Sequence, residues 1–180
     1  RIIQIQRDRF VHNWRKADSE GAYPRYNKII KSFQNHLKTF GEFIEEAELG
    51  DIQPIQYELT YVNQIPQGQA WTTLEDVGKV FPDISWKANS SRFLSIPQSM
   101  NWAATFDLPD EVGRLHVSLK PPVFNEIPVL FFELTVRGIG AYNSKESLLD
   151  WFDIAHIWIV QAFEDLTNKE IQVEVWRRRE

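Results

Sequence analysis

The chain has no cysteine and a single methionine among its 180 residues. Without thiolates it cannot form a disulfide bond, a cysteine-ligated zinc site or a cysteine nucleophile. It also has no apolar run that approaches the roughly 20 residues needed to cross a bilayer. It opens Arg-Ile-Ile-Gln-Ile-Gln, which is not a signal peptide. We therefore expect a cytoplasmic protein that does not enter the membrane.

Acidic residues outnumber basic ones, and aromatic residues are abundant. The 20 Lys and Arg against 25 Asp and Glu give a formal net charge of −5. This acidity argues against non-specific binding of nucleic acid. Aromatic residues make up 13% of the chain, with 7 Trp and 12 Phe. Rings in this number indicate a thick core, an aromatic-lined cavity or a buried interface.

Alternation of apolar and polar residues predicts antiparallel strands joined by hairpins. In the last predicted strand, even-numbered residues from 130 to 136 are apolar and odd-numbered residues from 131 to 137 are mostly polar. We expect Pro121-Pro122 to end the preceding strand, because proline lacks the backbone N–H of a ladder. The predicted strands are 3–6, 10–14, 55–66, 102–108, 115–119 and 128–138.

Two long helices are predicted. Apolar residues from Tyr26 to Ala47 recur at steps of four and three, which indicates one apolar stripe. Gly50 is expected to cap its C-terminal end. The second helix, over 144–167, is apolar around most of its circumference and needs an occupant on its second side. We expect the first helix to be that occupant.

Two further segments have the spacing of capping boxes, which open short helices. Thr72 and Glu75 are three residues apart, as are Thr167 and Glu170. The first predicts a short helix that ends before Pro82, and the second predicts a short terminal helix.

These elements predict an α+β fold, because the strands follow one another in hairpins and the helices are separate from them. We expect an antiparallel sheet of about five to six strands with two long helices on one face. A helix-grip arrangement, in which a curved sheet cradles a helix, and a flatter two-layer sandwich both satisfy this pattern. We expect a single domain over 1–180, which forms the C-terminal part of a longer protein.

Two strands share an aromatic-Glu-Leu-Thr pattern, over 57–60 and 132–135. It reflects either the narrow composition of strands or a duplicated half-domain. If the strands are neighbours, Glu58 and Glu133 share the face opposite the aromatic side chains. Candidate residues for binding a ligand or partner on that face are Glu58, Thr60, His116, Lys120, Glu133, Thr135 and Arg137. They form either a site for a charged ligand or for acid–base chemistry, or cross-strand ion pairs on a solvated face.

Few sequence signals point to catalysis. The four histidines, His12, His36, His116 and His156, have no metal-ligand spacing. We interpret His156 as a hydrogen-bonded structural residue. Gly138-Ile-Gly140 is too short for a dinucleotide-binding loop, and no Walker or nucleophile-elbow motif is present. We predict no metal, no cofactor and no catalytic residue.

A basic cluster near the N-terminus is the one candidate for nucleic acid. Its cations are interleaved with aromatic residues on which bases could stack, Phe10, Trp14, Tyr23 and Tyr26. The acidity of the whole chain makes this the less favoured hypothesis. The cluster consists of Arg7, Arg9, Arg15, Lys16 and Arg25, and a second basic group is Arg177, Arg178 and Arg179.

Five segments, in order, carry a resemblance that covers most of the chain: 4–15, 23–26, 58–65, 134–138 and 158–167. Together they resemble an uncharacterised, sporadically distributed prokaryotic protein family. Members of this family usually carry an additional N-terminal segment. The resemblance implies no known activity, cofactor or catalytic residue. Its patchy distribution implies an accessory role, for example in defence.

Three hypotheses of function follow. The first is a non-enzymatic interaction module, whose polar and aromatic sheet face binds a protein partner or the chain's own N-terminal segment. A homo-oligomer is a separate alternative for the assembly of the chain. The second is an enzyme or ligand carrier with a cavity between the sheet and the last helix, lined by Trp102, Phe106, Phe132, Trp151 and Trp158. The third is nucleic-acid binding through the N-terminal basic cluster.

Overall fold

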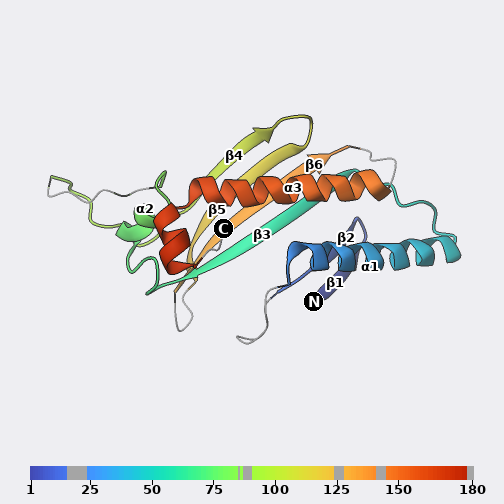
Figure 1. Ribbon diagram of the computed structural model, residues 1–180, viewed down its shortest axis with the longest axis horizontal. Helices are drawn as coiled ribbons and strands as arrows, with labels where there is room; N and C mark the ends of the chain where they lie inside the picture. Colours follow the sequence, from blue (N-terminus) through green and yellow to red (C-terminus); the bar gives the residue numbers. More distant parts are fainter. Residues whose placement is uncertain (16–23, 85, 87–90, 124–127, 141–144, 178–180) are drawn as a thin grey trace. The chain divides into compact units, whose positions relative to one another are not determined.

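The computed structural model describes residues 1–15, 24–84, 86, 91–123, 128–140 and 145–177. It has the α+β fold predicted from the sequence, with six strands in two antiparallel sheets (Figure 1). The chain divides into two compact units, Arg1–Gln53 and Pro54–Glu180. The strands are therefore not in one sheet, because the first hairpin pairs only with itself and has its own helix.

The N-terminal unit is a hairpin packed on a helix. Strands β1 (Ile2–Gln6) and β2 (Arg9–Asn13) are antiparallel, and α1 (Tyr26–Glu46) follows. The ring of Phe10 lies 5.3 Å from that of Phe40 and 6.0 Å from that of Phe33. The predicted stripe of α1 thus packs on the hairpin. The expectation that this stripe also covers the C-terminal helix stays a prediction.

The helix α1 ends earlier than the sequence suggested. The N–H of Glu48 donates to the carbonyl of Glu45 at 3.1 Å, and the N–H of Leu49 donates to that of Ile44 at 3.0 Å. This is a Schellman motif, which requires a left-handed residue after the cap. Glu48 takes that position with φ of 52°. The prediction of Gly50 at this position is therefore wrong, since the last carbonyls are already satisfied two residues earlier.

The second unit contains a four-stranded sheet in the order β3-β6-β5-β4. Each neighbouring pair of strands is antiparallel, and β3 pairs with β6 over its whole length without a shift. The strand before the last helix is thus central in the sheet. The strands are β3 (Gln56–Pro66), β4 (Trp102–Leu108), β5 (Gly113–Val123) and β6 (Val129–Ile139).

Pro121 and Pro122 do not end β5, contrary to the prediction. The strand runs to Val123, and its register against β6 shifts between Lys120 and Val123. Such a bulge interrupts the ladder locally, so the missing N–H groups of the two prolines are tolerated there.

Helix α3 (Lys145–Leu166) covers one face of this sheet (Figure 1). The core lies between the two, where every even-numbered residue of β6 from Leu130 to Val136 is fully buried. The ring of Phe132 packs 4.7 Å from that of Phe81. On the outer side of α3, Ile154 and Ile157 are exposed. The apolar character of this helix therefore extends beyond the face that it buries, as expected.

The short helices form where they were predicted, but with different caps. The segments Leu74–Asp76 and α2 (Val77–Val80) begin with a capping box of Thr73 and Asp76, one residue later than predicted. Asp76 accepts hydrogen bonds from Lys79 and from the N–H groups of Thr73 and Thr72. These bonds lower the pKa of its carboxyl group to about 2.

The terminal helix is a single π-helical turn, Ile171–Val175, and Thr167 does not cap it. The hydroxyl of Thr167 donates to the carbonyl of Phe163 at 2.6 Å, so it is already engaged. The side chain of Asn168 instead accepts the N–H of Glu170 at 2.8 Å. The predicted capping box at this end is therefore wrong.

The contact of Gly138 with Trp151 fixes α3 on the sheet. A Cβ atom at Gly138 would lie 2.6 Å from the indole Nε1 of Trp151. That side chain is only 1% exposed, and its Nε1–H donates to the carbonyl of Val112 at 2.9 Å. The ring therefore has no free space to move into.

We expect Gly138→Ala to lower the free energy of unfolding by about 1–3 kcal/mol, because the added methyl group overpacks this contact. The control is Gly41→Ala in α1, where an added Cβ meets nothing within 4 Å. It should stabilise by about 0.5–1 kcal/mol through helix propensity. Urea denaturation followed by circular dichroism measures both. A Gly138→Ala variant as stable as the native protein would contradict the close packing.

Candidate functional site

The seven predicted site residues lie on one face of the four-stranded sheet, the face away from α3. The strand registers establish this, because Glu58 is opposite Arg137, and Thr60 and His116 are both opposite Thr135. We call this surface the open face. The expectation that Glu58 and Glu133 share a face is confirmed by the pairing of β3 with β6.

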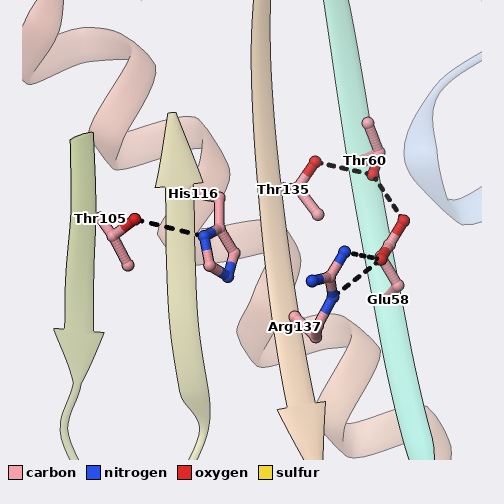
Figure 2. A network of polar contacts seen from close by, with 6 residues as sticks. All are labelled: Glu58, Thr60, Thr105, His116, Thr135 and Arg137. Carbon is pink, nitrogen blue, oxygen red and sulfur yellow. Dashed lines mark hydrogen bonds and ion pairs between the residues drawn. The ribbon is translucent and has the colours of Figure 1, made fainter. Parts of the chain in front are cut away.

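Glu58 and Arg137 form a cross-strand ion pair, which Figure 2 shows. The guanidinium donates from Nη2 at 2.7 Å and from Nε at 3.0 Å, both to Oε2 of Glu58. Both side chains are nearly half exposed. A pair in such solvent contributes about 0.2–1 kcal/mol, so it orients the side chains more than it stabilises the fold.

Two more ion pairs cross the strands of the open face. Lys120 Nζ lies 2.8 Å from Oε2 of Glu133, and Arg114 Nε lies 2.9 Å from Oδ1 of Asp107. The geometry therefore matches the cross-strand pairs that the sequence left as one of two alternatives. Asp107 and Arg114 were not predicted as site residues. The short connection between the predicted strands 102–108 and 115–119 could have shown them, because it sets the two strands opposite each other.

Side-chain hydrogen bonds outside the ion pairs also cross the strands of the open face (Figure 2). The hydroxyl oxygens of Thr60 and Thr135 are 2.9 Å apart, and Thr135 is buried. Nδ1 of His116 lies 3.3 Å from the hydroxyl oxygen of Thr105. These contacts join β3 to β6 and β4 to β5. The polar side chains of the open face are thus held in fixed positions by their neighbours.

Two apolar side chains lie among the polar residues of the open face. Val62 is opposite Glu133, and Phe131 is opposite Gln64, so Val62 and Phe131 are diagonal neighbours. Val62 is 51% exposed, and Phe131 is half-buried. The alternation over 128–138 puts Phe131 on the same face as Glu133, but Val62 was not predicted there, since a single valine in a strand gives no signal of its exposure.

The residues proposed to line an aromatic cavity do not share one environment. Phe132 and Trp151 are buried in the core. The ring of Phe132 packs against Phe81, and that of Trp151 lies 5.0 Å from that of Phe152. Phe106 is exposed, whereas Trp102 and Trp158 are half-buried.

The residues of the N-terminal basic cluster lie in different surroundings. Arg9 forms an ion pair with Asp8 at 3.2 Å. Phe10 is packed under α1 and does not offer its faces to a base. Arg7, Arg15 and Arg25 are exposed. Lys16 and Tyr23, and also Arg178 and Arg179, lie outside the described residues.

Among the described residues, no group of three or more His, Asp or Glu side chains could hold a metal ion. The hydroxyl of Tyr61 lies 2.9 Å from Nδ1 of His156, which confirms that this histidine is hydrogen-bonded, as predicted. His12 stacks on His36, with ring centroids 5.4 Å apart. In the part of the chain that the structure describes, no helix has the length and apolar character to span a membrane.

Comparisons with models of protein families, with curated proteins and with solved structures found no match. The fold and the open face therefore stand on their own geometry.

The burial of His12 beside His36 predicts that the N-terminal unit loses stability in acid. Burial lowers the pKa of His12, and the nearby His36, Arg1 and N-terminal amino group lower it further. The unfolded chain therefore takes up this proton first as the pH falls below about 6.5. The stability of the N-terminal unit should fall between that pH and the lower pKa of the native state.

We expect His12→Phe to reduce this loss of stability. Both ring nitrogens of His12 are buried and have no hydrogen-bond partner among the described residues, so phenylalanine should leave the stability at neutral pH unchanged or higher. Urea unfolding at about pH 7.5 and pH 5, a range that spans the unfolded-state pKa, measures the difference. His116→Phe, in the other unit, is the control. The same acid loss in His12→Phe and in the native protein would contradict the assignment.

Proposed function

We propose that this chain is a non-enzymatic interaction module that binds a protein partner on the open face. The observation that carries the proposal is the ordered set of cross-strand contacts, which presents charged groups beside the apolar pair Val62 and Phe131. In line with the family that the sequence resembles, the module would serve an accessory, defence-associated prokaryotic protein in the cytoplasm.

The charge on the open face favours a protein over nucleic acid. The three ion pairs contribute three acidic and three basic side chains, so the surface has no excess of either sign. A nucleic-acid site needs an excess of Lys and Arg to displace counterions from phosphates. A pattern of alternating signs is instead suited to a complementary protein surface, where it sets the register of binding.

The state of the carboxylates favours binding over catalysis. Glu58, Glu133 and Asp107 each accept a hydrogen bond from a cation, and their side chains are between 31% and 84% exposed. Acid–base catalysis uses a positioned group that is screened from bulk water and available to the substrate. These carboxylates are in contact with both solvent and a partner cation.

Preorganisation and apolar area supply the affinity. Side chains already held across strands lose little rotamer freedom when a partner arrives. Val62 and Phe131 offer apolar surface, and its removal from water by a partner is favourable. The partner is a separate protein, or an N-terminal segment of the kind that the resembled family carries.

The test is an exchange of charges within one ion pair. The double variant Lys120→Glu with Glu133→Lys keeps the cross-strand attraction but reverses the pattern that a partner meets. We expect it to retain the fold and to lose the partner. The tagged protein, isolated from its host and analysed by quantitative mass spectrometry, shows which proteins remain bound.

The matched control is the exchange Lys38→Glu with Glu42→Lys on α1, an exposed pair at 3.6 Å. It should leave the bound proteins unchanged. The proposal fails if the exchange on the open face also leaves every bound protein in place.

A further inference from the structure

The edge of β3 presents unpaired backbone groups in a regular row. Just beyond its two ends, the N–H of Gly140 donates to the carbonyl of Ile55, and the N–H of Gln67 donates to that of Pro128. Antiparallel pairing alternates, so the odd-numbered residues of β3 direct their backbone groups toward β6. The register has no shift in between. The even-numbered residues therefore direct theirs outward.

These outward groups have no described partner. Strand β3 is the first strand in the sheet order, with β6 on one side only. Within the described chain, no hydrogen bond is made to the backbone of the five even-numbered residues, Gln56, Glu58, Thr60, Val62 and Gln64. A row of free N–H and C=O groups at this spacing is a template for another extended strand.

This edge lacks the usual features that block such pairing. Natural edge strands are kept short or carry lysine, proline or a bulge. Strand β3 has eleven residues and an unshifted register, and its proline is the last residue. Its one charged residue, Glu58, is held by Arg137. The opposite edge, β4, has only seven residues.

We propose that β3 pairs in antiparallel fashion with β3 of a second copy, which makes a twofold dimer with one continuous sheet. The register that aligns all eleven residues is centred on Tyr61. It sets Glu58 against Gln64 of the second copy, and Thr60 against Val62. The first pair joins a carboxylate to an amide donor, and no like charges meet. A register centred on Glu58 would place two carboxylates opposite each other, which is destabilising.

Apolar side chains border the edge on both faces of the sheet. Val62 is 51% exposed on the open face. On the other face, Tyr61 contacts His156 of α3, and Val160, one turn later, lies on the same side of that helix and is exposed. A second copy along β3 would cover both valines. The twofold arrangement uses the outer edge of β3 in each of the two copies, so the assembly closes at two copies.

This inference goes beyond the proposed function, because it uses the backbone of β3 rather than the side chains of the open face. The test compares Val62→Pro with Val62→Thr in the full chain. Proline removes an outward N–H and leaves the bonds to β6 intact, whereas threonine keeps the N–H. Sedimentation equilibrium should give twice the mass of one chain for the native protein and Val62→Thr. The mass should halve for Val62→Pro.

Hydrogen exchange supplies the second readout. In the native protein, the amides of Thr60, Val62 and Gln64 should exchange slowly at high concentration and faster on dilution. The amides of Leu59 and Tyr61 should stay protected in every variant, which verifies the fold of Val62→Pro. A native protein with the mass of one chain at all concentrations overturns the proposal. So does equal mass for the two variants, or a different protein bound at β3. Loss of the partner in the Lys120–Glu133 exchange tests the open face separately.

Discussion

The unbroken pairing of β3 with β6 is the constraint on which the rest of the second unit depends. Side chains alternate with a period of two, so one register buries Phe132 and Leu134 in the core and places Glu133 on the open face. Burial of each such apolar side chain contributes about 1.5–3 kcal/mol, whereas an exposed ion pair contributes about 0.2–1 kcal/mol. The core therefore selects the register, and the polar contacts of the open face follow from it.

The same pairing separates two surfaces of different chemistry. The open face presents side chains that are already held by their cross-strand neighbours, which suits it to a specific partner. The edge of β3 presents backbone groups that have no partner among the described residues, and such groups are a general template for another strand. Val62 lies where the two surfaces meet, so its exposed side chain is available to either. The two proposed contacts use different polar groups of β3, side chains on the face and backbone at the edge, but they share the side chain of Val62.

Periodicity in the sequence predicted most of the elements, because the pattern of burial is local to each. The helices α1 and α3 and the strands β3, β4 and β6 lie within about one residue of their predicted bounds. The errors occur at the ends of helices and strands, where several residues compete for the same capping hydrogen bonds. Glu48 takes the left-handed position expected of Gly50, and Asp76 replaces Glu75 in the capping box. The prolines of β5 were misjudged because a bulge depends on the neighbouring strand.

The sequence by itself determined the α+β class and the face of each strand that becomes polar, because alternation and helical period are properties of short segments. Only the tertiary structure decided which strands are neighbours. Glu58 and Arg137 are 79 residues apart, and their ion pair exists because β3 lies beside β6. The division into two sheets and the place of β3 at the edge of its sheet were decided in the same way, since strand order depends on packing between distant segments.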